Sequence, residues 1–359
     1  MNMLMKDGAF TCADAASADA GVAVTLRFQD GVEKQLRAAP GQTILDAAKQ
    51  AGVRLVHQCL TGSCGTCVAK TVSGTVRMDS SRGTSLLPSE HAEGLRLTCT
   101  SCAETDAVLA LDYASTLLDE AQPQKYASTV SAMEWVASNV VRLSLQVADA
   151  DGFDFRSGQY VRLRVPGSDA WRSYSMASTA ADLPRVDLLL RVLDDGAMSN
   201  YLRGSCAVGA AMELEGAFGS FFWRASKAQH IMVAGGTGLA PMLAMLDEIR
   251  AQPGRKPKVL LSFGCATEDN LFCLDELEVR SAWMPTLQNR VSVSSPQAGY
   301  QGLVGNPVSV LGAGDVTDPE AVAYLCGPPA MIEAARNHLE SLGVKRENIY
   351  AEHFSASAQ

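Results

Sequence analysis

The chain carries, at residues 59–67, the stretch Cys-Leu-Thr-Gly-Ser-Cys-Gly-Thr-Cys, in which three cysteines follow the spacing C-x4-C-x2-C. A fourth cysteine follows after a long gap. Thiolate sulfurs bind iron strongly, and four of them complete the coordination of both irons in a [2Fe–2S] cluster. The glycines of the stretch leave room for backbone amides that donate hydrogen bonds to the cluster. The spacing predicts a cluster held by Cys59, Cys64, Cys67 and Cys99.

Zinc and disulfide bonds are the alternatives for these cysteines. Structural zinc sites usually show paired C-x2-C spacings, and Cys64–Cys67 with Cys99–Cys102 could supply such a pair. Ten cysteines in 359 residues do not form the dense framework of a small secreted domain. The longer C-x4-C-x2-C spacing therefore favours iron over both alternatives.

Composition limits the class of protein. A length of 359 residues predicts two or three domains. The net charge of −9 argues against nucleic acid and anionic membrane surfaces as partners. No segment has the length of a membrane span, and the first twenty residues lack the continuous apolar core of a signal peptide. We expect a cytoplasmic protein without membrane contact, and we interpret residues 1–20 as a flexible tail.

The first domain is expected at residues 21–114. Alternating apolar residues at 22–28 predict a strand, Asp30-Gly31 predicts a hairpin turn, and Thr43 caps a helix over 44–50. Together with the cysteine loop and the segment Leu-Thr-Cys at 97–99, this region resembles the plant-type ferredoxin domain, which implies a β-grasp (α+β) fold. A local departure is His57-Gln58, where related reductases often carry an acidic residue.

A linker is expected at residues 115–125, followed by a strand-rich domain at 126–224. Alternation of apolar residues at 141–147 and 161–165 predicts a small antiparallel β-barrel. The segment Arg-Ser-Tyr-Ser at 172–175 offers a guanidinium for a pyrophosphate, an aromatic ring and a hydroxyl for a flavin. The segment Gly-Ala-Met-Ser at 196–199 opens a helix whose N-terminus presents amides to a phosphate. An ordinary barrel strand is the alternative for the first segment alone.

Both segments, with Gly-Ser-Phe at 219–221, resemble the flavin domain of the ferredoxin–NADP reductase superfamily. The resemblance implies a bound FAD. The residues that it assigns to this cofactor are Arg172, Tyr174, Ser175, Gly196, Met198 and Ser199.

The third domain is expected at residues 225–359. The strand at 230–234 runs into Gly-Gly-Thr-Gly-Leu-Ala-Pro at 235–241 and then into a helix, which is the arrangement that binds dinucleotide phosphates. Further strands and helices alternate, and this order predicts an α/β domain with a parallel sheet. A plain strand–helix turn is the alternative for the glycine loop alone. Cys-Gly-Pro-Pro follows at 326–329.

The same superfamily pairs such a glycine loop with a Cys-Gly-Pro loop. The resemblance assigns the nucleotide phosphates to Gly235, Gly236, Thr237 and Gly238, and the nicotinamide to Cys326, Gly327 and Pro328. It implies that Phe354 covers the flavin ring, so that Ser175, Cys326 and Phe354 surround the hydride path, although core packing is the alternative for Phe354. No residue is assigned as a catalytic acid, base or nucleophile. The segment after the strand at 258–264 carries Glu268-Asp269 and no basic residue, which favours NADH over NADPH.

The whole stretch 21–355 resembles the reductase components of benzoate- and anthranilate-type 1,2-dioxygenases, and WRSYS with MSNYLR is most similar to the anthranilate branch. The resemblance implies electron flow from NADH through FAD and the cluster to a Rieske non-haem iron oxygenase that dihydroxylates an aromatic ring. One alternative is a reductase for a di-iron monooxygenase of the phenol or methane type. Another is a ferredoxin-like carrier fused to an inactive barrel. The sequence does not fix the oligomeric state, for which we take a monomer as the expectation.

Overall fold

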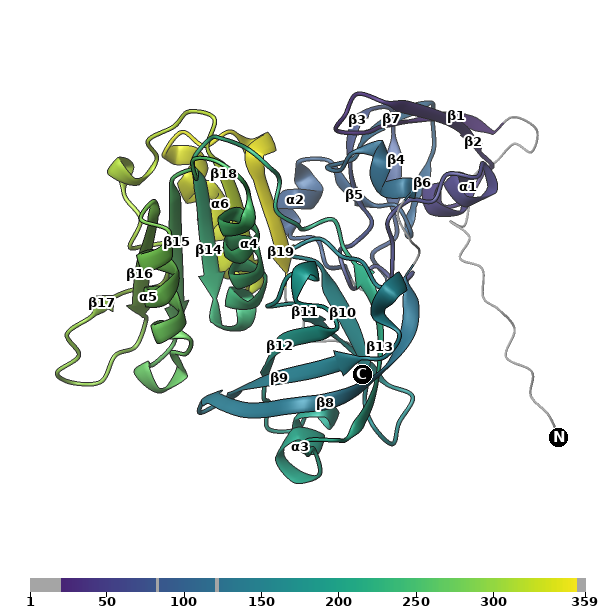
Figure 1. The fold of residues 1–359 in the computed structure, drawn as a ribbon. Coiled ribbons are helices and arrows are strands. Elements are labelled where there is room, and N and C mark those ends of the chain that lie inside the picture. Colours follow the sequence, from purple (N-terminus) through teal and green to yellow (C-terminus); the bar gives the residue numbers. More distant parts are fainter. Residues whose placement is uncertain (1–20, 82–83, 120–122, 354–359) are drawn as a thin grey trace. The chain divides into compact units, whose positions relative to one another are not determined.

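The computed structural model describes residues 21–81, 84–119 and 123–353 (Figure 1). The chain separates into two compact units, which divide between Glu120 and Ala121. Within the described ranges, no helix is both long enough and apolar enough to cross a lipid bilayer.

The first unit contains a five-stranded mixed sheet in the order β2-β1-β7-β3-β5 and a two-stranded sheet of β4 and β6. Its regular elements are β1 (Val22–Arg27), β2 (Glu33–Ala38), α1 (Ile44–Gln50), β3 (Val68–Ser73), β4 (Val76–Met78), α2 (Pro88–Ala92), β5 (Leu95–Leu97), β6 (Ser101–Ala103), β7 (Ala107–Ala110) and the 3-10 helix η1 (Ser115–Asp119). The Thr43 hydroxyl accepts the Asp46 amide at the start of α1 and so caps the helix, as the sequence predicts. Leu26, Ile44 and Leu109 are fully buried between the sheet and α1. This packing leaves residues 51–67, which contain three of the cysteines, as an irregular loop between α1 and β3.

The second unit begins with an antiparallel sheet of six strands in the order β11-β10-β13-β8-β9-β12. Its elements are β8 (Gln124–Ala137), β9 (Val140–Val147), η2 (Ala150–Gly152), β10 (Tyr160–Arg164), β11 (Trp171–Ser175), η3 (Ala180–Asp182), β12 (Arg185–Arg191), α3 (Ala197–Gly204) and β13 (Ala211–Phe218). A bridge between Met176 and Leu188 joins the two edge strands, so the sheet closes into the predicted barrel. Apolar side chains of alternate residues, including Leu143, Leu163 and Leu188, fill its interior.

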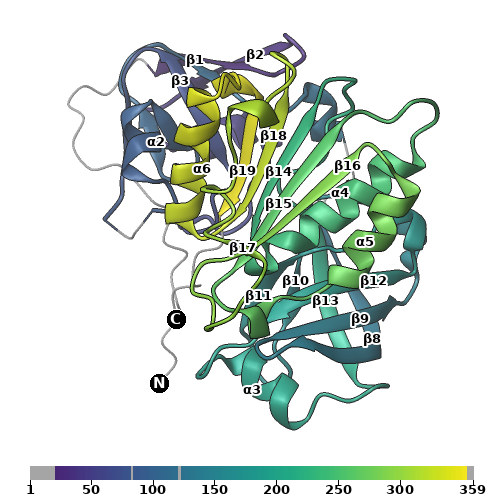
Figure 2. The ribbon, with the colours of Figure 1, turned by 90° about the vertical axis from the view of Figure 1, so that its left-hand side faces the viewer.

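A parallel sheet of six strands follows, in the order β17-β16-β15-β14-β18-β19. Its elements are β14 (His230–Gly235), η4 (Gly236–Gly238), α4 (Leu239–Ala251), β15 (Val259–Cys265), η5 (Glu268–Asn270), α5 (Leu274–Trp283), β16 (Leu287–Val293), β17 (Leu303–Val304), η6 (Ala313–Asp315), β18 (Val322–Gly327), α6 (Pro329–Ser341), η7 (Arg346–Asn348) and β19 (Ile349–His353). The α4 and α5 helices pack on one face of the sheet and α6 packs on the other (Figure 2). The predicted α/β domain is therefore confirmed, and its glycine loop and Cys-Gly-Pro loop both leave the carboxyl ends of neighbouring strands.

Two local features differ from the sequence prediction. The segment expected to be an irregular linker contains η1 over Ser115–Asp119, and β8 already begins at Gln124. The five residues of η1 show no apolar periodicity, because this single 3-10 turn buries only Leu117. A single buried side chain gives no repeating pattern from which a helix could be predicted.

Candidate functional site

The four predicted cluster cysteines of the first unit lie as two pairs. The thiol of Cys64 hydrogen-bonds to Cys59, and the thiol of Cys99 hydrogen-bonds to Cys67. The bond from Cys64 is the main reason why the pKa of Cys59 is lowered to about 3. Two cysteines for each of two irons is the arrangement that a [2Fe–2S] cluster requires. In the part of the chain that the structure describes, no three histidine, cysteine or carboxylate side chains gather around one point, as a mononuclear zinc site would need.

Backbone amides of the cysteine loop point toward these sulfurs. The amide of Thr61 donates to Cys59 Sγ over 3.4 Å, and the amide of Gly62 donates to Cys99. Gly62 and Gly65 have φ angles of 81° and 73°, in the left-handed region that favours glycine. Leu60, between them and Cys59, also has a positive φ of 60°. The loop is therefore bent so that its amides donate inward, which fits the hydrogen bonding that a sulfur cluster needs.

The predicted flavin residues lie along the edge strand β11 of the barrel. The guanidinium of Arg172 donates to the Trp171 carbonyl over 2.9 Å, and it pairs with no carboxylate among the described residues. Tyr174 occupies the same face two residues further, and burial raises the pKa of its hydroxyl. Arg172 thus has a charge available for a pyrophosphate, and Tyr174 places a ring beside it, so the residues fit FAD.

The N-terminus of α3 lies after β12 and presents the second predicted phosphate contact. A Cβ on Gly196 would lie 2.8 Å from Ser199 Oγ, so a larger residue at this N-cap would displace the Ser199 hydroxyl. The Ser199 hydroxyl accepts the Leu193 amide over 2.9 Å, and the Met198 side chain is buried in the barrel core. Any contact of Met198 with a phosphate is therefore through its backbone amide and not through its side chain.

The two nucleotide loops meet at the ends of β14 and β18. A Cβ on Gly238 would lie 2.1 Å from the carbonyl oxygen of Cys326, and one on Gly235 would lie 2.7 Å from Met331 Sδ. Gly236 and Gly327 have φ angles of 55° and 153°. Glycine is therefore required for the two loops to pack this closely, and the contact brings the predicted phosphate and nicotinamide residues together.

The predicted flavin strand β11 and the predicted nicotinamide loop at residues 326–328 (hereafter the flavin strand and the nicotinamide loop) are joined through β19. The Ser175 hydroxyl donates to Glu352 Oε2 over 2.7 Å, and Glu352 is the β19 residue paired with Cys326 of β18. Burial raises the pKa of Glu352 to about 7, and the hydrogen bond from Ser175 opposes this shift. Burial also raises the pKa of Cys326, which keeps its thiol uncharged at neutral pH. Phe354, the third predicted residue of this region, lies outside the described residues.

Arg191 is a candidate that the sequence alone did not single out. It ends β12 and is exposed, and no described carboxylate pairs with it. Burial raises the pKa of Cys265 to about 12, while a bond from the Gly236 amide and the charge of Arg191 oppose that shift. Its charge reaches Cys265, and β12 lies beside η4 of the glycine loop, so Arg191 is a candidate to bind a dinucleotide phosphate. No motif marks this residue, because its position depends on how the barrel packs against the parallel sheet.

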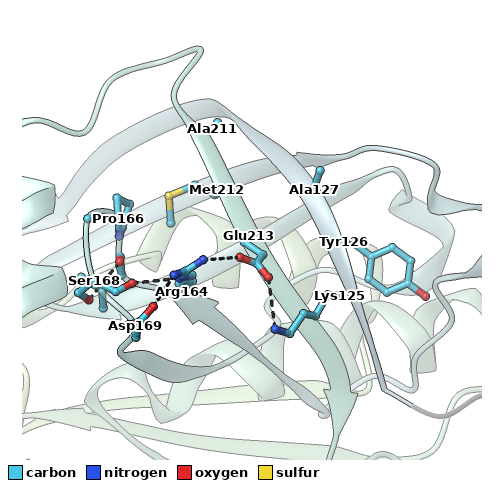
Figure 3. A pocket seen from close by; sticks show the side chains of 12 residues that line it. Lys125, Tyr126, Ala127, Arg164, Pro166, Ser168, Asp169, Ala211, Met212 and Glu213 are labelled. Carbon is cyan, nitrogen blue, oxygen red and sulfur yellow. Dashed lines mark hydrogen bonds and ion pairs between the residues drawn. The ribbon is translucent and has the colours of Figure 1, made fainter. Parts of the chain in front are cut away.

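A cavity of about 760 Å³ lies elsewhere on the barrel (Figure 3). It is lined by the start of β8, the turn between β10 and β11, and the start of β13. Its charged side chains pair with one another: Arg164 with Glu213 and Asp169, and Lys125 with Glu213. None of the predicted cofactor residues lines this cavity, and its charges are already neutralised, so we do not assign it to the flavin.

Three family profiles match the chain in the order that the sequence predicts. The 2Fe-2S iron-sulfur cluster binding domain matches residues 27–104, the oxidoreductase FAD-binding domain matches 127–223, and the oxidoreductase NAD-binding domain matches 232–337. The toluate 1,2-dioxygenase electron transfer component of Pseudomonas putida is 35% identical over 93% of this chain and 99% of its own length. The chain belongs to this family of reductases. It is an oxidoreductase with sites for NADH, FAD and a [2Fe–2S] cluster.

Other relatives carry different names. The anthranilate 1,2-dioxygenase electron transfer component of Acinetobacter baylyi is 32% identical over 93% of this chain and 97% of that protein. The xylene/toluene monooxygenase electron transfer component of Pseudomonas putida is 33% identical over 89% and 91% of the two chains. A solved structure of an Amycolatopsis cytochrome P450 reductase has a TM-score of 0.68 and 26% identity, and the match covers 93% of this reductase and all of that chain. The three-domain architecture is therefore shared by reductases with different partners.

Proposed function

We propose that this reductase takes a hydride from NADH and delivers the electrons to the Rieske non-haem iron oxygenase of an aromatic-acid 1,2-dioxygenase, in the cytoplasm. The observation that carries the proposal is the match to the toluate dioxygenase component over nearly its whole length, with all three cofactor domains. The aromatic substrate is bound by the oxygenase, so this chain needs no site for it.

The residues of the second unit have distinct tasks in this proposal. When bound, FAD accepts the hydride of NADH and releases two electrons one at a time toward the cluster. Arg172 and the amides at the start of α3 hold the FAD phosphates, and Gly235 to Gly238 with Arg191 hold those of NADH. The bond between Ser175 and Glu352 orients the serine hydroxyl at the flavin strand, and Glu352 can hold a proton there near neutral pH. Cys326, Gly327 and Pro328 orient the nicotinamide.

The selection of NADH is supported by the segment after β15. Glu268 accepts the Gln297 amide with Oε1 over 2.8 Å, while its Oε2 is buried without a hydrogen-bond partner among the described groups. An acidic group at this end of the strand favours a free ribose and repels a 2′-phosphate. We propose that Glu268 makes NADH the preferred donor.

A monooxygenase is the second candidate partner. The 33% identity to the xylene/toluene monooxygenase component slightly exceeds that to the anthranilate component, and fold and cofactors do not identify the partner. Purified reductase mixed in separate reactions with a Rieske dioxygenase and a di-iron monooxygenase, each with NADH and substrate, separates the two. Coupled product formation with the dioxygenase supports the first proposal, and product only with the monooxygenase overturns it.

The electron path has its own test in Cys59→Ser. We expect the variant to lose the cluster, because one iron keeps only one thiolate ligand, while NADH still bleaches the flavin at the wild-type rate. Iron content, EPR and the reduction of cytochrome c measure these effects, and Cys206→Ser in the barrel is the control. A Cys59→Ser protein that passes electrons to cytochrome c as fast as wild type would contradict the path through the cluster.

A further inference from the structure

The segment 219–229 connects the barrel strand β13 to β14 of the parallel sheet. It lies directly on the barrel loop that precedes β10. The Trp223 amide donates to the Ser157 carbonyl over 2.9 Å, and Gln159 Nε2 donates to the Gly219 carbonyl over 2.9 Å. A Cβ on Gly158 would lie 2.9 Å from Phe222 Cα. The connection is therefore fixed on its barrel side by backbone contacts.

Arg224 fixes the same segment on the side of the parallel sheet. Its guanidinium carbon lies 3.5 Å from the centre of the Tyr350 ring of β19 and 4.6 Å from the centre of the Phe222 ring. Its Nη1 and Nη2 donate to the carbonyls of Phe222 and Ser220 over 3.0 and 3.2 Å. Its backbone amide donates to the Tyr324 hydroxyl of β18 over 2.9 Å. One arginine thus joins the connection to two strands of the sheet.

The strand β19 is held on one face at two points. Tyr350 and Glu352 are two residues apart and point to the same side, where Tyr350 meets Arg224 and Glu352 accepts the Ser175 hydroxyl. The register pairs Tyr350 with Tyr324 and Glu352 with Cys326. A shift of β19 at Tyr350 would therefore move both the bond to the flavin strand and the nicotinamide loop beside it.

We propose that Arg224 is a positioning residue for hydride transfer. Arg224 holds β19 against the segment 219–229 and thereby sets the distance between the nicotinamide loop and the flavin strand β11. This inference rests on the proposed function. The planar guanidinium is suited to the role, because it lies flat on an aromatic ring while its edges donate to two carbonyls. Lysine can supply the charge but not this fork.

The test compares Arg224→Met, Arg224→Lys and the control Arg250→Met in the full chain loaded with FAD and cluster. Arg250 lies over the exposed Trp283 at 5.2 Å, so its replacement removes a similar contact away from the connection. Rapid mixing with NADH gives the rate of flavin reduction at saturation and the half-saturating concentration. Hydrogen exchange of amides 349–353 reports how firmly β19 is held, independently of any reaction. FAD content and the thermal midpoint are measured for each variant.

We expect Arg224→Met to keep its FAD and its half-saturating NADH concentration within about threefold, while the saturated reduction rate falls by about tenfold to a hundredfold. Amides 349–353 should exchange faster in Arg224→Met than in Arg250→Met, and Arg224→Lys should lie between Met and wild type. A lower thermal midpoint with an unchanged reduction rate would overturn the inference. If Arg224→Met does not fold, a wild-type rate in Arg224→Lys overturns it equally. A wild-type protein that NADH does not reduce refutes the proposed function instead, and the exchange data still decide whether Arg224 anchors β19.

Discussion

At the residue scale, two arginines of the barrel are candidates for phosphate binding because no described carboxylate compensates their charge. Arg162 and Arg164 of the barrel pair with Glu215 and Glu213, whereas Arg172 and Arg191 pair with no described carboxylate. A guanidinium that the fold leaves unpaired is available for a phosphate, because its charge is not yet compensated. The sequence motif makes Arg172 a candidate, whereas Arg191 becomes one only through the packing of β12 beside the glycine loop.

Arg172→Ala should weaken FAD retention. Loss of one charge-assisted contact to a pyrophosphate corresponds to about 2 kcal/mol, or roughly thirtyfold in the dissociation constant. Flavin fluorescence after stepwise dilution measures the dissociation. Arg185→Ala is the matched control, since Arg185 already pairs with Asp182 and Asp187 on the same barrel. Equal FAD loss from the two variants would rule out a phosphate role for Arg172.

Glu352 should make stability depend on pH. Burial raises its pKa to about 7, so between about pH 4.3 and pH 7 the folded chain holds a proton that the unfolded chain releases. The free energy of unfolding therefore falls as the pH rises through this window, by about 3 to 4 kcal/mol from this group. Glu352→Gln keeps an acceptor for Ser175 but cannot titrate, so its thermal midpoint should fall less between pH 5 and pH 8. Glu278→Gln, on the exposed side of α5, should follow wild type. Parallel curves for all three proteins would refute this role of Glu352.

At the element scale, strands, helices and loop motifs could be predicted because each leaves a local pattern. The alternation of apolar residues in β9 and β10 and the helix cap at Thr43 each involve only residues close together in the sequence. The glycine loop could be found for the same reason. The resemblance brings the glycine loop and the Cys-Gly-Pro loop to one nucleotide, but it does not predict which groups touch directly: Glu352 with Ser175, Arg224 with Tyr350, and Gly238 with Cys326. These contacts depend on how β19, the segment 219–229 and η4 pack together in the folded chain. The residues next to each of them in the sequence do not indicate that packing.

The contact between the two nucleotide loops gives a prediction at this scale. Gly238→Ala places a Cβ against the Cys326 carbonyl, so the loops must separate. We expect the half-saturating NADH concentration to rise by about tenfold or more while FAD content stays unchanged, because the phosphate amides move with the loop. Gly314→Ala, where a Cβ meets nothing within 4 Å, is the control. NADH kinetics equal to those of the control would show that the close packing of the loops is not needed for binding.

At the scale of the whole molecule, each of the three domains corresponds to one cofactor: the [2Fe–2S] cluster, FAD or NADH. The cysteine pairs lie in the first unit, and the barrel and parallel sheet of the second unit place Ser175 and Cys326 on either side of Glu352. The central claim is that these sites act in one electron path from NADH. That claim concerns the loaded full chain and can be tested without any partner.

Anaerobic titration of the full chain with NADH, and separately with NADPH, followed by absorbance and EPR, tests the claim most directly. We predict that NADH bleaches both flavin and cluster and produces a [2Fe–2S] EPR signal, with full reduction at about 1.5 NADH per chain, because the flavin takes two electrons and the cluster takes one. NADPH should need a much higher concentration, given the acidic Glu268. A flavin that stays oxidised, or a cluster that is never reduced after the flavin, would contradict the account.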